Sequence, residues 1–420
     1  MARPKNRVEG INYAHTQAAR LSGKDCAAVD STPGEGHMAF DTEIFLFIDA
    51  LGWELVSRTD FLKDVLPYRR PAEMQFGYSC SAIPTILSGK TPAEHGHLSL
   101  FRFAPAESPF RRLGRLAPFL KPASFWNRGR VRGWLSKLIK RLYGFTGYFQ
   151  LYQMPLAKLP MMDYCEKNDL FAAHGLGGIE NLRDMLAKSG RIFHISDWHL
   201  GDRRNFEAAR KALADGADFL FIYTAELDAL LHQYPVLLAD PIRAKVNWYR
   251  EEVLGLLETC RQLGRTPRLT LFSDHGMTPL THAIDLKGAV EGTGLVFGRD
   301  YGACYDSTLF RVTFLKPEAE AVIRKAVKPF EDSGHWLTEE EERHYGIYRA
   351  DRRFGDAIFL TAPGVQIAPS DMGAKPLNGM HGFAPEDKDS QAVILSNDEI
   401  PPDVRRVADY FGLMRRRAVK

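Results

Sequence analysis

The stretch EIFLFIDALGW, residues 43–53, is a short apolar run that ends in an aspartate, a small residue and a glycine. Its continuous hydrophobicity is typical of a strand that is buried on both faces, as in a parallel sheet. The same pattern returns in ADFLFIYTAELD (217–228) and in LTLFSDHGM (269–277). Helix-like stretches precede these two runs, at 205–217 and 241–264. The alternation predicts an α/β fold with a central, mostly parallel sheet flanked by helices.

Acidic residues and histidines follow each predicted strand directly. Asp49 ends the first run, Asp228 the second, and Asp274 with His275 the third. Because ligands collect at the carboxyl ends of the strands in such folds, we expect these side chains to share one site. His232 lies four residues after Asp228, so on a helix both side chains would share a face and reach one metal ion. Taken alone, the pair equally fits a helix-start aspartate and a partly buried histidine.

The composition is that of an ordinary globular protein. The 420 residues are 45% hydrophobic and 25% charged, and 55 basic against 52 acidic residues give a net charge of +3. No global polyelectrolyte partner is implied, so we expect no nucleic acid polymer as a ligand. The five cysteines are scattered, which argues against a disulfide scaffold and against a cysteine-only zinc site. With no apolar secretory segment and no apolar run near about 20 residues, the sequence predicts a cytoplasmic protein.

The chain divides into six predicted segments. Residues 1–37 are polar and irregular and predict a disordered leader, with Met38 as an alternative translation start. Residues 302–363 predict a small α+β subdomain, in which LTEEEERHYG (337–346) is an acidic turn region. The other segments are a first core segment (38–107), a basic and aromatic cap insertion (108–178), a second core segment (179–301) and a third core segment (364–420).

The cap insertion has no acidic residue between 108 and 162, and it predicts a basic helix in VRGWLSKLIKRLYGF (131–145). We expect one apolar face to pack on the core, formed by Val131, Leu135, Leu138 and Leu142. Basic side chains occupy much of the remainder, among them Arg132, Lys137, Lys140 and Arg141. This basic face is either a solvated surface, a site at which Lys137, Lys140 and Arg141 capture an anionic phosphate-ester substrate, or a weak contact of 130–145 with an anionic membrane. Of the two binding roles we favour substrate capture.

A reactive alcohol is expected in GYSCSAIPTILSGKTPAEHGHLS (77–99). Ser79, Ser81 and Thr85 are each candidate nucleophiles near a helix start, which favours an anion, although a serine that only caps the helix is common. NGMHGF (378–383) adds His381 between two glycines, which permit close backbone approach. Three carboxylates, three histidines and one alcohol are enough to bind two divalent cations. Mixed nitrogen and oxygen ligands suit Zn²⁺, with Mn²⁺ or iron as alternatives.

In their order these motifs resemble the alkaline phosphatase superfamily, and within it the type I phosphodiesterase/nucleotide pyrophosphatase branch. FIDALGW, SCSAIPTILSGKTPAEHG, DALLH, SDHGM and GMHGF follow one another between about 43 and 386. The resemblance implies a nucleophile ten positions before Gly89, which is Ser79. It also implies one metal site from Asp228, His232 and His381, and a second from Asp49, Asp274, His275 and the Ser79 alkoxide.

The resemblance implies a two-metal hydrolase of phosphoric esters that acts through a phospho-serine, most like a phosphodiesterase or nucleotide pyrophosphatase with Zn²⁺. Sulfatase activity is not expected, because the x-Pro-x-Arg that follows a sulfatase nucleophile is absent after Ser79. Nucleotide pyrophosphatases usually have Thr at this position and an Asn shortly after the HG pair, whereas HGHLSLFRF (95–103) has no Asn, which leaves nucleotide specificity open. The alternatives are a phosphomonoesterase or phosphoryl-transfer enzyme of the same fold, and a non-catalytic membrane-surface or glycan-associated binding protein.

Overall fold

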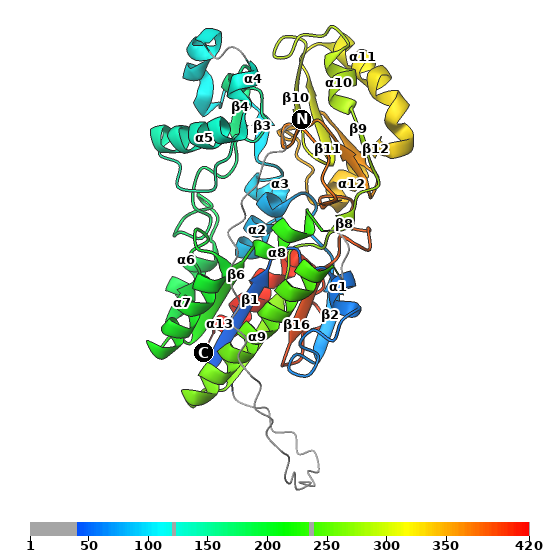
Figure 1. Ribbon diagram of the computed structural model, residues 1–420. Coiled ribbons are helices and arrows are strands. Elements are labelled where there is room, and N and C mark those ends of the chain that lie inside the picture. The colour runs from blue at the N-terminus through cyan, green and yellow to red at the C-terminus, as the bar shows by residue number, and fades with distance from the viewer. Residues whose placement is uncertain (1–39, 120–122, 235–238, 420) are drawn as a thin grey trace, which may run out of the picture. The chain divides into compact units, whose positions relative to one another are not determined.

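The structure is a computed structural model that describes residues 40–119, 123–234 and 239–419; the predicted leader at 1–37 lies outside the described residues. Six strands form the central sheet in the order β2-β16-β7-β1-β6-β5 (Figure 1). They are β1 (Thr42–Ile48), β2 (Tyr68–Ala72), β5 (Phe193–Ile195), β6 (Phe219–Thr224), β7 (Pro267–Phe272) and β16 (Ala392–Ser396).

The sheet is mostly parallel, as predicted. Strand β1 pairs in parallel with β6 and β7, and β5 pairs in parallel with β6. Strand β16 runs antiparallel to both β7 and β2. The strands recognised in the sequence as continuous apolar runs are therefore the three at the centre of the sheet.

Helices cover both faces of this sheet, which explains why every residue of β1 is buried. Ile44, Leu46 and Ile48 pack on one side against α7 (Asp202–Ala214) and α9 (Asp240–Gln262). Phe45 and Phe47 point to the other side and pack among residues of three other helices, α2 (Ser79–Ser88), α6 (Leu182–Ala187) and α13 (Tyr410–Ala418). Alternate side chains of one strand thus enter two hydrophobic cores.

The predicted cap insertion contains several helices and one strand of a short antiparallel ribbon, whose other strand lies just before the insertion in the sequence. Strands β3 (Phe101–Phe103) and β4 (Met162–Tyr164) pair with each other, and aromatic side chains such as Phe110, Phe145 and Phe149 fill the core beside them. Its helical elements are η1 (Pro109–Phe119), α4 (Ala123–Trp126), α5 (Gly129–Tyr143) and η2 (Leu159–Met161).

The buried face of α5 differs in part from the prediction: Leu135 packs against a hydrophobic core as expected, but the prediction was wrong for Leu138 and Leu142. Arg132, Ser136 and Ile139 are buried, whereas Leu138 and Leu142 are 37% and 68% exposed. The reason is that α5 is held by polar contacts: the Arg132 guanidinium donates to the Met154 carbonyl at 2.6 Å, and the Ser136 hydroxyl accepts from the backbone N–H of Leu151 at 3.0 Å. These bonds turn the Leu138–Leu142 side toward solvent.

A second sheet of four strands, in the order β10-β11-β13-β12, forms the smaller subdomain (Figure 1). Its strands are β10 (Tyr301–Tyr305), β11 (Leu309–Phe314), β12 (Gly334–Trp336) and β13 (Ala357–Thr361), and residues of α10 (Leu286–Glu291) and α11 (Pro317–Val327) join its core. The predicted turn region 337–346 is instead mostly a helix, α12 (Glu339–His344), because Thr338 and Glu341 form a capping box at its start.

The remaining elements are short. They are α1 (Trp53–Ser57), α3 (Pro92–His95), α8 (Glu226–Leu231), β8 (Thr278–Pro279), β9 (His282–Ile284), η3 (Lys328–Ser333), β14 (Val365–Ile367), β15 (Gly379–Met380) and η4 (Val407–Asp409). Among the described residues, no helix is both long enough and apolar enough to cross a membrane.

Candidate metal centre

The predicted metal ligands lie at the carboxyl ends of the three central strands. Asp49 follows β1, and Asp274 with His275 follows β7. Helix α8 begins two residues after β6; it carries Asp228, and His232 follows its last residue. Because these strands are neighbours and run in parallel, their ends meet at one edge of the sheet.

The first group of ligands surrounds the imidazole of His275. Its Nε2 lies 3.1 Å from Asp274 Oδ2 and 3.6 Å from Asp49 Oδ1. The Ser79 hydroxyl, at the first residue of α2, lies 3.2 Å from the same nitrogen. Asp49, Asp274 and His275 are buried, and one donor atom from each lies within 4.8 Å of the others. These residues are the predicted second metal site.

The second group of ligands surrounds the carboxylate of Asp228. His232 Nε2 lies 3.4 Å from Asp228 Oδ2, and His381 Nε2 lies 3.7 Å from Asp228 Oδ1. His381 follows β15, which pairs with β8 just after the SDHGM motif and so returns the late loop to the site. The ring of His381 stacks on that of His275 with centroids 3.7 Å apart, so the two groups adjoin.

Backbone groups orient two of the histidines. His232 Nδ1 bonds to the Gly379 carbonyl and His275 Nδ1 bonds to the Gly276 carbonyl, each at 2.8 Å. Both contacts leave Nε2 for a metal ion, in the manner in which proteins commonly fix a histidine ligand. Asp274 Oδ1 accepts from the backbone N–H of Ala50, a residue in the left-handed conformation with φ 61°. The turn after β1 therefore positions a carboxylate that follows β7.

Two motif glycines allow these turns to touch. A Cβ atom on Gly52 would lie 2.7 Å from the Cα of Gly276, and one on Gly276 would lie 2.2 Å from the Asp389 carbonyl. No side chain fits at either position without a shift of backbone. The FIDALGW and SDHGM motifs thus pack backbone against backbone, which holds Asp49 beside Asp274.

The donor groups fit divalent cations. Asp49 Oδ1, Asp228 Oδ1, Asp274 Oδ2 and His381 Nδ1 are buried and have no hydrogen-bond partner among the described residues. Burial raises the pKa of Asp49 well above its usual range, and the nearby Asp274 and Asp228 carboxylates raise it further. Among the described residues, only histidines pair with these carboxylates. Buried carboxylates this close require positive charge, which two bound cations would supply.

The structure separates the candidate nucleophiles. Ser79 lines a cavity of about 590 Å³ together with Asp49, Asp228, His232 and His381. The Ser81 hydroxyl is fully buried and donates to the Phe76 carbonyl at 2.8 Å. The Thr85 hydroxyl is buried on the same helix, 3.1 Å from both the Ser81 carbonyl and His95 Nε2. Of the three, only Ser79 lines the cavity that these four predicted metal ligands also line.

Aromatic side chains form much of the cavity wall, and sequence reasoning did not single them out. They are Tyr78, Tyr148, Tyr152, Phe171, Trp198 and Tyr223. The signal that could have identified them was the aromatic content of the cap insertion, which supplies Tyr148, Tyr152 and Phe171. Lys137 and Arg141 do not line this cavity, whereas the Lys140 ammonium lies 5.1 Å from the ring centroid of Trp198 at its wall.

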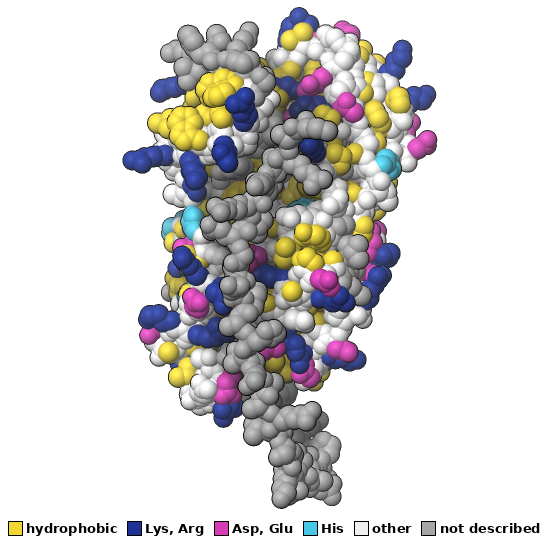
Figure 2. Space-filling view, in the orientation of Figure 1, with side chains coloured by type: hydrophobic (Ala, Val, Ile, Leu, Met, Phe, Trp, Pro, Cys, Tyr) yellow, Lys and Arg dark blue, Asp and Glu magenta, His cyan; other side chains and the backbone are white. Residues whose placement is uncertain are grey.

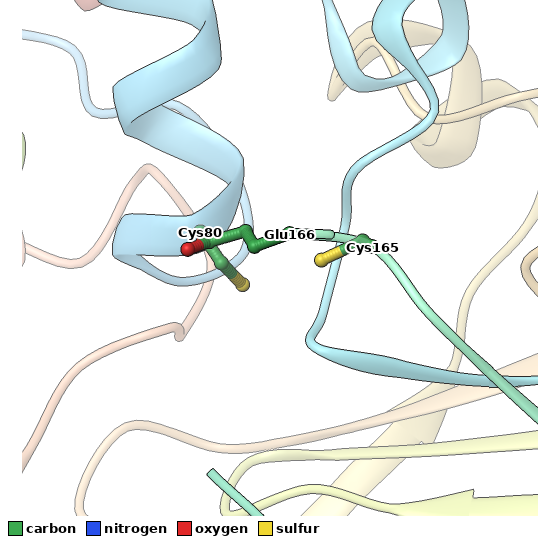
Figure 3. Close-up of side chains that lie close together, drawn as sticks. All are labelled: Cys80, Cys165 and Glu166. Atoms are coloured by element: carbon green, nitrogen blue, oxygen red, sulfur yellow. The ribbon is translucent and has the colours of Figure 1, made fainter. Parts of the chain in front are cut away.

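Beside Ser79 the structure brings together Cys80, Cys165 and Glu166, as Figure 3 shows. Cys80 and Glu166 line the same cavity. The scattered spacing of the cysteines gave no indication of this cluster, because Cys80 belongs to α2 whereas Cys165 and Glu166 follow β4.

Comparisons with known proteins agree with this architecture. The family model for type I phosphodiesterase / nucleotide pyrophosphatase matches residues 44–384, and no curated protein sequence matches the chain. Human ectonucleotide pyrophosphatase / phosphodiesterase 5 is a similar solved structure, with 12% identity, a TM-score of 0.63, and coverage of 90% of this chain and 94% of that one. The murine protein, inactive and in complex with AMP, has 12% identity, a TM-score of 0.61, and coverage of 90% and 95%. At this identity the two structures are evidence for the fold alone.

Proposed function

Because the chain belongs to the type I phosphodiesterase / nucleotide pyrophosphatase family, we propose that it hydrolyses phosphoric diesters at a two-metal centre, through a phospho-serine at Ser79. The observation that carries the proposal is that two groups of potential metal ligands, Asp49/Asp274/His275 and Asp228/His275/His381, meet at His275, whose Nε2 lies 3.2 Å from the Ser79 hydroxyl. A non-catalytic binding protein of the same fold would be expected to lack some of these ligands.

We assign one cation to Asp49, Asp274, His275 and Ser79, and the other to Asp228, His232 and His381. Bound there, Zn²⁺ or Mn²⁺ would lower the basicity of the serine oxygen and neutralise charge on the phosphoryl group. The nitrogen-rich second group favours Zn²⁺ over Mg²⁺ or Ca²⁺, which prefer oxygen ligands.

In the proposed reaction the Ser79 hydroxyl loses its proton to solvent and its oxygen attacks phosphorus, while the bond between phosphorus and the leaving alcohol breaks. The alcohol takes up a proton, and water then cleaves the phospho-serine to release the phosphoryl product and regenerate the serine. Ser79 is the first residue of α2, so the positive end of the helix dipole would attract the charge of a phosphoryl group bound there. Walls formed by Tyr148, Tyr152 and Trp198 would limit the access of water to this step.

A diester is favoured over a monoester by the space beside the serine. The cavity of about 590 Å³ has room for an organic group on each side of the phosphate, and its aromatic wall suits a ring or an acyl chain. A phosphomonoesterase would need only a small anionic pocket. This aromatic wall would determine which alcohol groups of the diester can bind, and a nucleoside is one candidate.

The exposed face of α5 favours membrane contact over substrate capture. Trp134, Leu138 and Leu142 are 60%, 37% and 68% exposed, and their spacing of four residues places them in one apolar stripe. Lys137 and Arg141 are exposed beside this stripe, and Figure 2 shows hydrophobic and basic side chains gathered at this end of the molecule. An apolar stripe next to a basic one suits a helix that lies on an anionic bilayer. A cytoplasmic location stays a prediction, with which such a surface is compatible.

The experiment that tests the function is a substrate panel. Protein freed of metal with a chelator is assayed on bis(p-nitrophenyl) phosphate, a dinucleoside pyrophosphate and p-nitrophenyl phosphate, before and after addition of Zn²⁺ or Mn²⁺. We expect hydrolysis only with metal, and a higher kcat/KM for the diester or pyrophosphate than for the monoester. A preference for the monoester would support the phosphomonoesterase alternative, and metal-independent turnover would contradict the two-metal proposal.

A further inference from the structure

The cluster of Cys80, Cys165 and Glu166 has no role in the proposed reaction, although Cys80 and Glu166 line the cavity. One donor atom from each residue lies within 4.8 Å of the others. Figure 3 shows the sulfur of Cys165 turned toward Cys80, and the Glu166 side chain reaching across to Cys80. Helix α2 and the end of β4 therefore present three potential metal ligands to one another.

Glu166 is the unexplained member of this cluster. It is only 7% exposed and lines the cavity, and no hydrogen bond or ion pair of its carboxylate is found among the described residues. Burial alone raises its pKa to about 8, and no basic group offsets this effect. A buried carboxyl group is normally protonated, paired with a cation or bound to a metal, because an isolated charge in an apolar site is costly.

The two thiols also lack strong partners. The Cys80 thiol lies 3.9 Å from the Leu98 carbonyl, which is a weak contact, and burial raises the pKa of the Cys165 thiol well above its usual range. The His97 imidazole lies beside Cys165, where it opposes this rise in pKa, and the buried His97 Nδ1 has no hydrogen-bond partner among the described residues. Two sulfurs, one imidazole and one carboxylate are donors that together satisfy a tetrahedral Zn²⁺ ion.

We propose that Cys80, Cys165 and Glu166, with His97 beside Cys165 as a candidate fourth ligand, form a third cation site, separate from the two-metal centre and selective for a thiophilic divalent ion such as Zn²⁺. The donor atoms of Cys80, Cys165 and Glu166 lie within 4.8 Å of one another, so their separations need to shrink by only about 1 Å to allow zinc–sulfur bonds of about 2.3 Å. Thiolate ligands exclude Mg²⁺ and Ca²⁺, which take oxygen ligands.

The site would connect the cap to the core. Cys80 is the neighbour of Ser79 in α2, and Cys165 with Glu166 belongs to the segment that leaves β4 in the cap. An ion held by both sides would fix the first turn of α2 against the cap wall. It would act as a positioning site for Ser79 and would not participate in the chemical step.

The test uses Co²⁺ in place of Zn²⁺, because a cobalt ion bound to thiolates gives an intense charge-transfer absorption that nitrogen and oxygen ligands do not give. Full-length protein is reduced, freed of metal and titrated with Co²⁺. We expect the thiolate band in the parent protein and its loss in Cys165→Ser. Cys260→Ala, which alters a buried cysteine of α9 far from the cluster in sequence, is the matched control and should keep the band.

Two further variants separate this site from the proposed function. Asp228→Asn should impair the two-metal centre but keep the thiolate band, whereas Glu166→Gln should shift the band and weaken Co²⁺ affinity at least tenfold. Zinc analysis should give close to three ions per chain for the parent and close to two for Cys165→Ser. If Cys165→Ser fails to fold, the Co²⁺ titrations of the parent protein and of Glu166→Gln still show whether the third cation site exists. Absence of a thiolate band in the reduced parent protein, or a Cys80–Cys165 disulfide that persists as its only stable state, would overturn the proposal.

Discussion

Ser79 and Ser81 belong to the same helical turn, and the structure predicts opposite consequences for their replacement by alanine. The Ser79 hydroxyl faces the cavity at 3.2 Å from His275 Nε2, whereas the Ser81 hydroxyl is fully buried and donates to the Phe76 carbonyl at 2.8 Å. One side chain is placed for chemistry and the other for folding. The two variants are therefore controls for each other.

For Ser79→Ala we expect kcat on bis(p-nitrophenyl) phosphate to fall by at least about 1,000-fold, since removal of a nucleophile commonly costs more than this. Stability should change by less than about 1 kcal/mol, because the lost contact is one partly exposed hydrogen bond. Metal content should remain close to that of the parent, because aspartates and histidines still supply the other ligands.

For Ser81→Ala we expect activity within a few-fold of the parent. The free energy of unfolding should fall by roughly 1–3 kcal/mol, because the substitution removes a buried hydrogen bond and leaves the Phe76 carbonyl without its donor. Denaturant titration measures this loss, and steady-state kinetics on both variants measures activity. An inactive Ser81→Ala beside an active Ser79→Ala would refute the assignment of the nucleophile, although the family assignment would stand.

Three other predictions concern the metals, the membrane surface and pH. His381→Ala should lose about one of the ions of the two-metal centre, measured by elemental analysis, and an unchanged metal content would contradict its assignment as a ligand. The double variant Lys137→Glu/Arg141→Glu should bind vesicles of equimolar phosphatidylserine and phosphatidylcholine at least tenfold more weakly than the parent in sedimentation, with kcat on a soluble diester unchanged; equal binding would return α5 to a plain surface. Burial raises the pKa of Glu43 to about 7, against a smaller opposing effect of Arg268, so the stability that its protonated form provides is lost as pH rises from about 4.5 through 7. Glu43→Gln should remove this decline, which is on the order of 3 kcal/mol, in unfolding experiments at several pH values, and an unchanged pH profile would show that the carboxyl is not the cause.

The sequence by itself determined the central architecture. Continuous apolar runs at 43–48, 219–224 and 269–272 identified strands buried on both faces, and the polar residues after them identified the edge of the sheet where a site forms. This was possible because a parallel strand that is buried on both faces consists of a continuous run of apolar residues. In addition, neighbouring parallel strands end at the same edge of the sheet. The order of the motifs then indicated the family.

Local sequence was less informative where burial depends on distant partners. The apolar stripe of α5 predicted a packed face, but the Arg132 and Ser136 side chains find carbonyl and amide groups of 151–154 and bury the polar side instead. A helical pattern alone does not show which neighbours are available. The acidic segment 337–346 was misread for a different reason, because the Thr338–Glu341 capping box outweighs the turn-like composition.

The tertiary structure alone decided which side chains share the cavity. It gave Ser79 access and buried Ser81, two residues away, because the first turn of α2 faces the metal ligands on one side and the Phe76 backbone on the other. It also brought Cys80 to Cys165 and Glu166, a contact between helix and cap that no spacing in the sequence indicates. Periodicity reports the burial of a segment, whereas such a cluster depends on how separate segments pack, and only the folded chain specifies that.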